Sequence, residues 1–285
     1  MGGGGGGGGG VYAVGTVLTY LIPSPIGTNV ERLAELVAPA LLLAALLTPA
    51  LPVMRRMALV TALVLSTAWV AQKTADDLEV STVVPAWATD TQAVVRELKR
   101  LGADRGRVEV VPARNHREAT ALAPYVNMAR GWNRQLDIER GRLFYDGSFS
   151  ATTYRAWLDK WAVGFVVLPS GRPDGPALDE AALVRSGPKW LEPVWKDKHW
   201  RIFRVRNAVP MASAPASVVR STSTDVVVRV PERGSVTVRI VYSPWLRAAG
   251  ACLKPNGEFT ELTVQTPGTY RISSGYGRPS RPSAC

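Results

Sequence analysis

The sequence has only two cysteines, Cys252 and Cys285, and only two histidines. The CxxC and Cys/His spacings of zinc sites are absent, which excludes a metal centre of that kind. No GxSxG, HExxH, GxGxxG or GxxxxGK[ST] motif occurs either. The sequence therefore has none of the standard signatures of serine hydrolases, zinc proteases, dinucleotide-binding enzymes or nucleoside triphosphatases.

Charge is scarce over the first 72 residues, which include three apolar segments at 11–23, 33–54 and 57–70. Apolar runs of this kind predict a membrane anchor of about three transmembrane helices within residues 11–72. A hairpin of two spans, with the first segment at the interface, is the alternative. A cleaved signal peptide is disfavoured because the chain starts with a glycine tract over 1–10, expected to be disordered, rather than a basic region.

Arg55 and Arg56 alone separate the second and third apolar segments. The positive-inside rule places this pair in the cytoplasm. Residues from about 73 onward are then extracytoplasmic, and the membrane is the plasma membrane. A disulfide between Cys252 and Cys285 fits that compartment and would contribute about 3–4 kcal/mol, the alternative being two free thiols.

The remaining sequence predicts two folded parts. Residues 73–209 read as an α/β domain, because the strands expected at 107–111 and 162–168 are separated by amphipathic helices. A linker rich in small residues follows at 210–215. Residues 216–285 predict a small all-β, sandwich-like module of short strands joined by turns.

The net charge of +11 falls almost entirely on this second portion. Its basic residues are scattered, and no helix-turn-helix, zinc-finger or RNA-binding signature accompanies them. Nucleic acid is therefore excluded as a partner, and membrane lipids are the expected one.

The densest polar cluster follows the strand predicted at 107–111, where α/β proteins commonly bind ligands. His116 with Glu118 is a candidate general base with an orienting acid. The other candidates would grip a sugar or phosphate by charge and stacking. They are Arg114, Arg130, Trp132, Arg134, Gln135 and Asp137. A structural ion-pair network is the alternative, and Tyr145 is assigned to packing.

Two further groups are weaker candidates. Asn29 and Arg32, in the loop between the first two apolar segments, could face a lipid-linked substrate or serve as ordinary interfacial anchors. His199 lies among tryptophans on a predicted hairpin; such a cluster stacks sugars in some proteins but more often covers a sheet or the membrane face.

Several segments of the sequence resemble a known family. They are PSPIGTNVERL, VEVVPARNHREATALAP, MARGWNRQLD, LFYDG, WAVGFVVLPSG and HWRIFRV. In this order, after apolar helices, they resemble the C-terminal part of actinobacterial integral membrane proteins similar to GT-C-type glycosyltransferases. The similarity extends over nearly everything after residue 10.

The resemblance implies an enzyme that takes a sugar from a polyprenyl-phosphate donor outside the cytoplasm and delivers it to a cell-envelope glycan. The catalytic carboxylate of such enzymes lies in an early outer loop that this sequence does not match, so no catalytic residue is assigned. No cofactor is evident, although a divalent metal is compatible with the full-length family. The expected role is to position an acceptor glycan or a lipid-phosphate donor. A non-catalytic, membrane-anchored binding protein of the cell envelope is the alternative.

Overall fold

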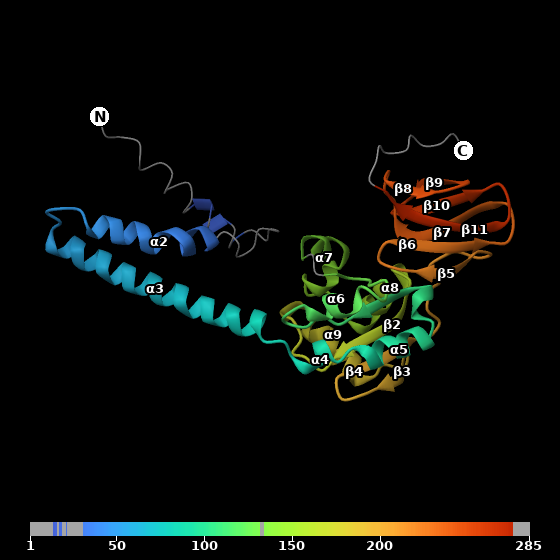
Figure 1. The fold of residues 1–285 in the computed structure, drawn as a ribbon, viewed down its shortest axis with the longest axis horizontal. Helices are drawn as coiled ribbons and strands as arrows, with labels where there is room; N and C mark the ends of the chain where they lie inside the picture. Colours follow the sequence, from blue (N-terminus) through green and yellow to red (C-terminus); the bar gives the residue numbers. More distant parts are fainter. Residues whose placement is uncertain (1–13, 16, 19–20, 22–30, 132–133, 276–285) are drawn as a thin grey trace. The chain divides into compact units, whose positions relative to one another are not determined.

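The computed structural model describes residues 14–15, 17–18, 21, 31–131 and 134–275 (Figure 1). The chain divides into two compact units, residues 1–83 and residues 84–285.

Over residues 31–83, the first unit is described as the helices α2 (Glu31–Leu46) and α3 (Val53–Thr82), which pack side by side. An ion pair joins them, with Lys73 Nζ 2.5 Å from Glu35 Oε1. Within the described residues, only α3 is both long and apolar enough to cross a membrane. The prediction of about three spans is therefore wrong, and the first apolar segment lies mostly outside the described residues.

The difference arises at the prolines of the second apolar segment. The run at 33–54 breaks at Leu46, and a turn containing Pro49 and Pro52 follows. Proline has no N–H to donate and disfavours helix at the residue before it, so two prolines within four residues oppose continuation, although α2 accommodates the single Pro39. The resulting helix has 16 residues. At 1.5 Å per residue it is about 24 Å long, short of the ~30 Å of a hydrocarbon core. The third run instead continues as helix through polar residues to Thr82.

The second unit begins with a mixed α/β region built on a four-stranded sheet. Its strands, in the order β1-β2-β4-β3, are β1 (Arg107–Val110), β2 (Val163–Pro169), β4 (Trp200–Val205) and β3 (Leu191–Lys196). Strands β1 and β2 are parallel, whereas β4 is antiparallel to both β2 and β3. The parallel pair brings the carboxyl ends of β1 and β2 to one edge of the sheet.

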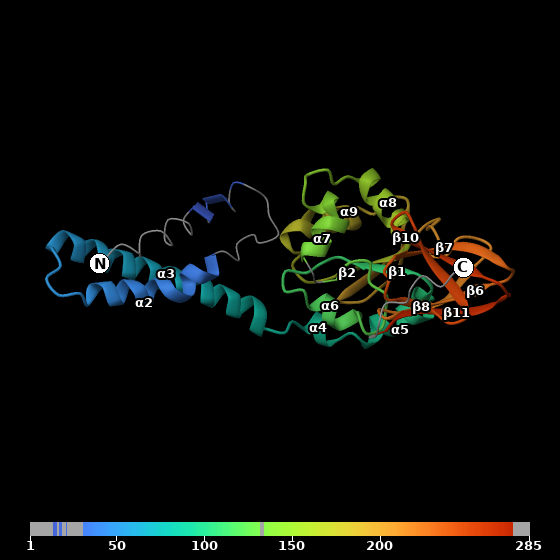
Figure 2. The same ribbon diagram turned by 90° about the horizontal axis from the view of Figure 1, so that it is seen from above.

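Helices cover both faces of this sheet (Figure 2). On one face lie α4 (Ala86–Thr89), α5 (Gln92–Arg100) and α6 (Arg117–Leu122); on the other lie α7 (Arg134–Arg140), α8 (Ala151–Lys160) and α9 (Leu178–Ser186). Alternate residues of β2 enter two separate cores: Val166 and Leu168 pack with α8 and α9, and Phe165 and Val167 pack with α5 and α6. This alternation is the two-residue period of a strand buried on both faces.

The last part of the unit is all β. One sheet has the order β7-β10-β9, from β7 (Gly234–Val241), β10 (Phe259–Val264) and β9 (Ala251–Asn256). The other has the order β5-β6-β11-β8, from β5 (Ser217–Ser221), β6 (Asp225–Val230), β11 (Gly268–Ser274) and β8 (Leu246–Ala248). Valines of β6 and β7 share one core with Leu262 and Ile272, so the two sheets pack together as a sandwich.

Cys252 lies in β9 and is buried. Its predicted partner, Cys285, lies outside the described residues, so the disulfide stays a prediction.

The apolar surface of α3 generates a test of anchoring. We expect the full chain to stay with the membrane pellet after alkaline carbonate extraction, and the double variant V64R/L65R to shift to the supernatant. Both side chains are exposed on α3, and each arginine at a helix centre costs about 2.5–3.5 kcal/mol of insertion free energy. The control is V83R/V84R, which adds the same charges beyond the helix. A wild-type chain that carbonate extracts fully would contradict membrane insertion.

Candidate functional site

The candidate site lies where the loops after β1 and β2 meet. The loop after β1 carries Pro112 to His116, and the loop after β2 carries Arg172 to Asp174. Backbone hydrogen bonds join them: the Arg114 N–H donates to Arg172 O at 2.8 Å, and the Asp174 N–H donates to Pro112 O at 2.9 Å. Because the strands are parallel and adjacent, two loops 58 residues apart in sequence are fixed against each other.

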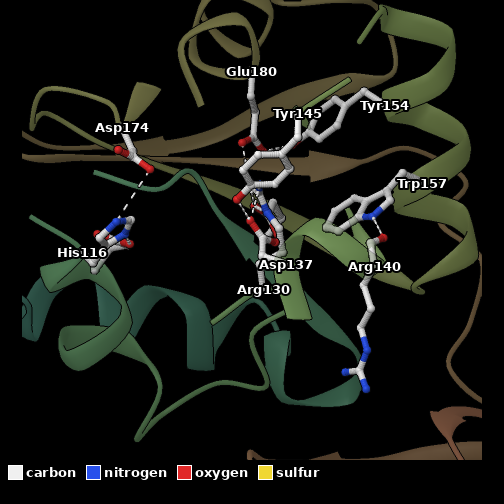
Figure 3. Close-up of polar contacts among 11 residues, drawn as sticks. His116, Arg130, Asp137, Arg140, Tyr145, Tyr154, Trp157, Asp174 and Glu180 are labelled. Carbon is white, nitrogen blue, oxygen red and sulfur yellow. Dashed lines mark hydrogen bonds and ion pairs between the residues drawn. The ribbon is translucent and has the colours of Figure 1, made fainter. Parts of the chain in front are cut away.

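This junction places an imidazole between two carboxylates (Figure 3). His116 Nδ1 lies 3.6 Å from Glu118 Oε1, and His116 Nε2 lies 3.7 Å from Asp174 Oδ2. Both contacts are longer than hydrogen bonds. Each ring nitrogen therefore faces a carboxylate, and the general-base role of His116 stays a prediction.

The backbone of His116 is itself unusual. Its φ is 52°, in the left-handed region that residues other than glycine seldom adopt. Such a conformation costs about 1–3 kcal/mol, which the surrounding contacts must offset. The His116 N–H donates to Ala113 O at 2.9 Å, and the Arg117 N–H donates to Asn115 Oδ1 at 3.3 Å. The turn therefore holds the imidazole between the two loops.

A small hollow opens beside His116 and is here called the acidic hollow. Its lining includes the polar residues His116, Glu118, Arg130, Asp137, Tyr145 and Asp174, together with Met128 and Pro176. Its volume is about 20 Å³, room for roughly one water molecule. Three carboxylates against one guanidinium make the lining acidic.

Arg130 forms the floor of this hollow and is almost fully buried. Its Nε and Nη2 donate to Glu109 Oε1 at 2.8 and 2.6 Å, and Nη2 also donates to Glu180 Oε2. Its Nη1 lies 3.7 Å from Asp137 Oδ2. A single buried cation thus joins carboxylates from β1, α7 and α9.

Aromatic side chains complete the surroundings of Arg130. Its guanidinium lies 3.6 Å from the centre of the Phe144 ring, a cation–π contact. The Tyr154 hydroxyl donates to Glu180 Oε1 at 2.7 Å, and the Tyr145 hydroxyl donates to Asp137 Oδ2. Each carboxylate around Arg130 except that of Glu109 therefore also has a phenol partner.

Burial decides the protonation of this cluster. It raises the pKa of Glu109 well above its usual range, although the Arg130 charge opposes the shift. The three surrounding carboxylates raise the pKa of Arg130, which keeps it a cation. Burial, together with Glu180, also raises the pKa of the Tyr154 hydroxyl. The native cluster therefore favours retaining a proton on Glu109.

Two carboxylates that line the hollow have unused acceptors. Among the described residues, Glu118 Oε2 and Asp137 Oδ1 are buried and have no hydrogen-bond partner. A buried acceptor left unpaired costs about 1–3 kcal/mol, so a ligand that donates hydrogen bonds gains from pairing with it. No set of three or more His, Cys, Asp or Glu side chains in the described ranges is placed to hold a metal ion.

The structure brings together four of the predicted site residues: His116, Glu118, Arg130 and Asp137. Arg114 is exposed and does not line the hollow. Arg134 and Gln135 begin α7, but their side chains, like Trp132 and Asn29, lie outside what the structure describes. Arg32 belongs to the other unit, where it is exposed on α2.

Sequence reasoning missed Asp174, Glu109, Glu180 and Tyr145. Tyr145 was assigned to packing, and it does pack against the core beside α8 and α9, but its hydroxyl also bonds to Asp137 at the hollow. A signal for Glu109 was present, because it is the one charged residue inside the apolar run 108–111. A carboxylate at the centre of a buried strand requires a buried partner. Asp174 had no comparable signal.

A protein-family model described as a domain of unknown function (DUF8823) matches residues 213–254. These residues contain β5 to β8 and part of β9, well away in sequence from the acidic hollow. No curated protein and no solved structure matches the chain. The comparisons thus assign no activity.

The buried position of Arg130 generates a stability prediction. We expect R130M to lower the free energy of unfolding of the full chain by about 3–5 kcal/mol, since it leaves buried carboxylates without their cation. Chemical denaturation followed by tryptophan fluorescence would measure this. The control is R142M, which removes an exposed arginine from the same region and should change stability by less than about 0.5 kcal/mol. Equal effects of the two variants would contradict the central role of Arg130.

The raised pKa of Glu109 generates a pH prediction. The pKa of Glu109 is higher in the native state than in the unfolded chain, where it is near 4.5. The contribution of Glu109 to stability is therefore fully present below pH 4.5 and is lost as the pH rises through its native pKa. We expect the wild type to lose stability relative to E109Q between pH 4.5 and neutrality, by up to about 1.4 kcal/mol per pH unit. Parallel stability curves for the two proteins over that range would show that Glu109 does not retain a proton.

Proposed function

We propose that residues 84–285 form the glycan-binding part of a membrane-anchored, glycosyltransferase-like protein. The acidic hollow would bind a hydroxyl-bearing end of an acceptor glycan. The proposal assigns a binding role to these residues and no catalytic step.

The observation that carries the proposal is the pair of unused buried acceptors at the hollow. Glu118 Oε2 and Asp137 Oδ1 need hydrogen-bond donors, and a sugar hydroxyl supplies one without bringing charge. Carboxylate acceptors form the stronger class of hydrogen bond. A phosphate is disfavoured at this hollow because Glu118, Asp137 and Asp174 would repel it. Of the two ligands that the resemblance implies, the acceptor glycan therefore fits better than the lipid-phosphate donor.

The size of the hollow limits how much of a ligand can enter. A volume of about 20 Å³ admits one hydroxyl-sized group rather than a whole pyranose ring. Met128 and Pro176 at the lining offer apolar contact to the carbon atoms beside that hydroxyl. The hollow is therefore suited to recognise one end of a sugar.

The membrane context supports the same proposal. Helix α3 is long and apolar enough to cross a membrane and ends four residues before α4. Anchoring would keep the glycan-binding region close to lipid-linked substrates, and the Arg55-Arg56 pair favours the plasma membrane with this region outside the cytoplasm. A non-catalytic binding protein of the cell envelope remains the alternative for the same site.

Binding of the detergent-solubilised full chain to an array of neutral oligosaccharides tests the proposal. We expect E118Q to weaken binding by about 10- to 100-fold, because a hydrogen bond to a charged group contributes about 1.5–3 kcal/mol. E232Q is the matched control, since it makes the same change on an exposed turn of the β module and should bind like wild type. The absence of any neutral glycan ligand, or equal binding by E118Q and wild type, would overturn the proposal.

A further inference from the structure

A second hollow in the same unit has the opposite charge. It lies beyond the carboxyl end of β2 and beside the turn between β3 and β4, and is here called the basic hollow. Its polar lining consists of Ser170, Arg185, Asp197, Lys198, His199 and Arg201. Its volume is about 260 Å³, more than ten times that of the acidic hollow.

The cations of the basic hollow are mostly uncommitted. In the part of the chain that the structure describes, the side chains of Arg185 and Arg201 are exposed and take part in no hydrogen bond or ion pair. Lys198 has one weak partner, with its Nζ 3.4 Å from Asp90 Oδ2 at an exposed position. A guanidinium offers a planar fork of donors that matches an oxyanion. Two such groups facing one hollow form a ready anion site.

The one acidic residue of the lining is already occupied. Asp197 Oδ1 accepts hydrogen bonds from the N–H groups of His199 and Trp200, at 2.8 and 2.7 Å. These bonds close the β3–β4 turn and partly neutralise the carboxylate. The lining has three cations, Arg185, Lys198 and Arg201, and one carboxylate, Asp197. Its net charge is therefore about +2.

The frame of the hollow is fixed before any ligand arrives. The Ser170 N–H donates to His199 O at 2.7 Å, which ties the end of β2 to the turn. Trp200 is buried and meets Trp87 edge to face, with ring centres 5.4 Å apart. His199 Nε2 is buried without a hydrogen-bond partner among the described residues, so a polar ring atom at this turn is still available. A preformed frame lowers the cost of binding.

From this geometry we infer that the basic hollow binds a phosphate group. A dianion would balance the net charge of the lining. Arg185 on α9, Arg201 on β4 and Lys198 in the β3–β4 turn supply donors from three elements, which suits a tetrahedral oxyanion. The inference is independent of glycan binding at the acidic hollow. The phosphate could be carried by a soluble ester or by a lipid, and both would present the same oxygens to Arg185 and Arg201.

Equilibrium dialysis of the detergent-solubilised full chain against radiolabelled inorganic phosphate, at constant ionic strength in chloride, tests the inference. We expect saturable binding of one phosphate per chain and at least a tenfold loss of affinity in R185Q/R201Q. The matched control, R204Q/R229Q, removes two other exposed arginines and should bind like wild type. No saturable binding, or equal losses in the two double variants, would overturn the site.

Competition then distinguishes the two sources. Glycerol 3-phosphate and the short-chain lipid dihexanoyl phosphatidic acid would each be tested for displacement of the labelled phosphate. Displacement by either one supports a phosphate-ester site, and the stronger competitor identifies the source. If neither displaces the label, the inference fails. Because these assays contain no sugar polymer, their failure would leave the glycan proposal unaffected.

Discussion

A single buried cation, Arg130, holds the centre of the α/β region together. It joins Glu109 on β1 to Glu180 on α9 and contacts Asp137 on α7, elements that lie far apart in sequence. The desolvation of this buried cation and the carboxyl groups around it is offset only when their geometry is mutually satisfied. The position of the acidic hollow depends on this constraint, since Arg130 and Asp137 line it while Phe144 and Tyr154 pack behind them.

The parallel pairing of β1 and β2 then explains why both hollows lie at the same edge of the sheet. The loops that leave the two strands are forced together. The loop after β2 lines both hollows: Ser170, at its start, lines the basic hollow, and Asp174 lines the acidic one. The two hollows have opposite charge because different elements surround them. The loop after β1 lies beside the carboxylates around Arg130, whereas Ser170 contacts the basic turn between β3 and β4.

The parts of this arrangement that could be predicted were local. The apolar run at 162–168 predicted β2 because its pattern is contained in seven residues, and the VEVV segment predicted β1. The ligand site expected after β1 stays a prediction. Asp174 could not be predicted, since its role comes only from the pairing of β1 with β2, whose paired residues lie 56 or 57 positions apart in sequence. The predicted number of membrane spans was wrong for a local reason as well. Hydropathy counts Pro49 and Pro52 as part of an apolar run, but prolines have no N–H to donate, and the helix ends before them.

The two hollows together restrict the ligand more than either does alone. Only three residues lie between Ser170 and Asp174, so their backbones are four residue steps and at most about 14 Å apart. By charge, a phosphate would be repelled at the acidic hollow and attracted at the basic one, whereas an uncharged hydroxyl would donate a hydrogen bond to Glu118 and gain little from Arg185. If both proposals hold, a molecule that bears a sugar end and a phosphate spaced to reach both hollows would bind in one orientation only, because reversing it would oppose like charges at the acidic hollow.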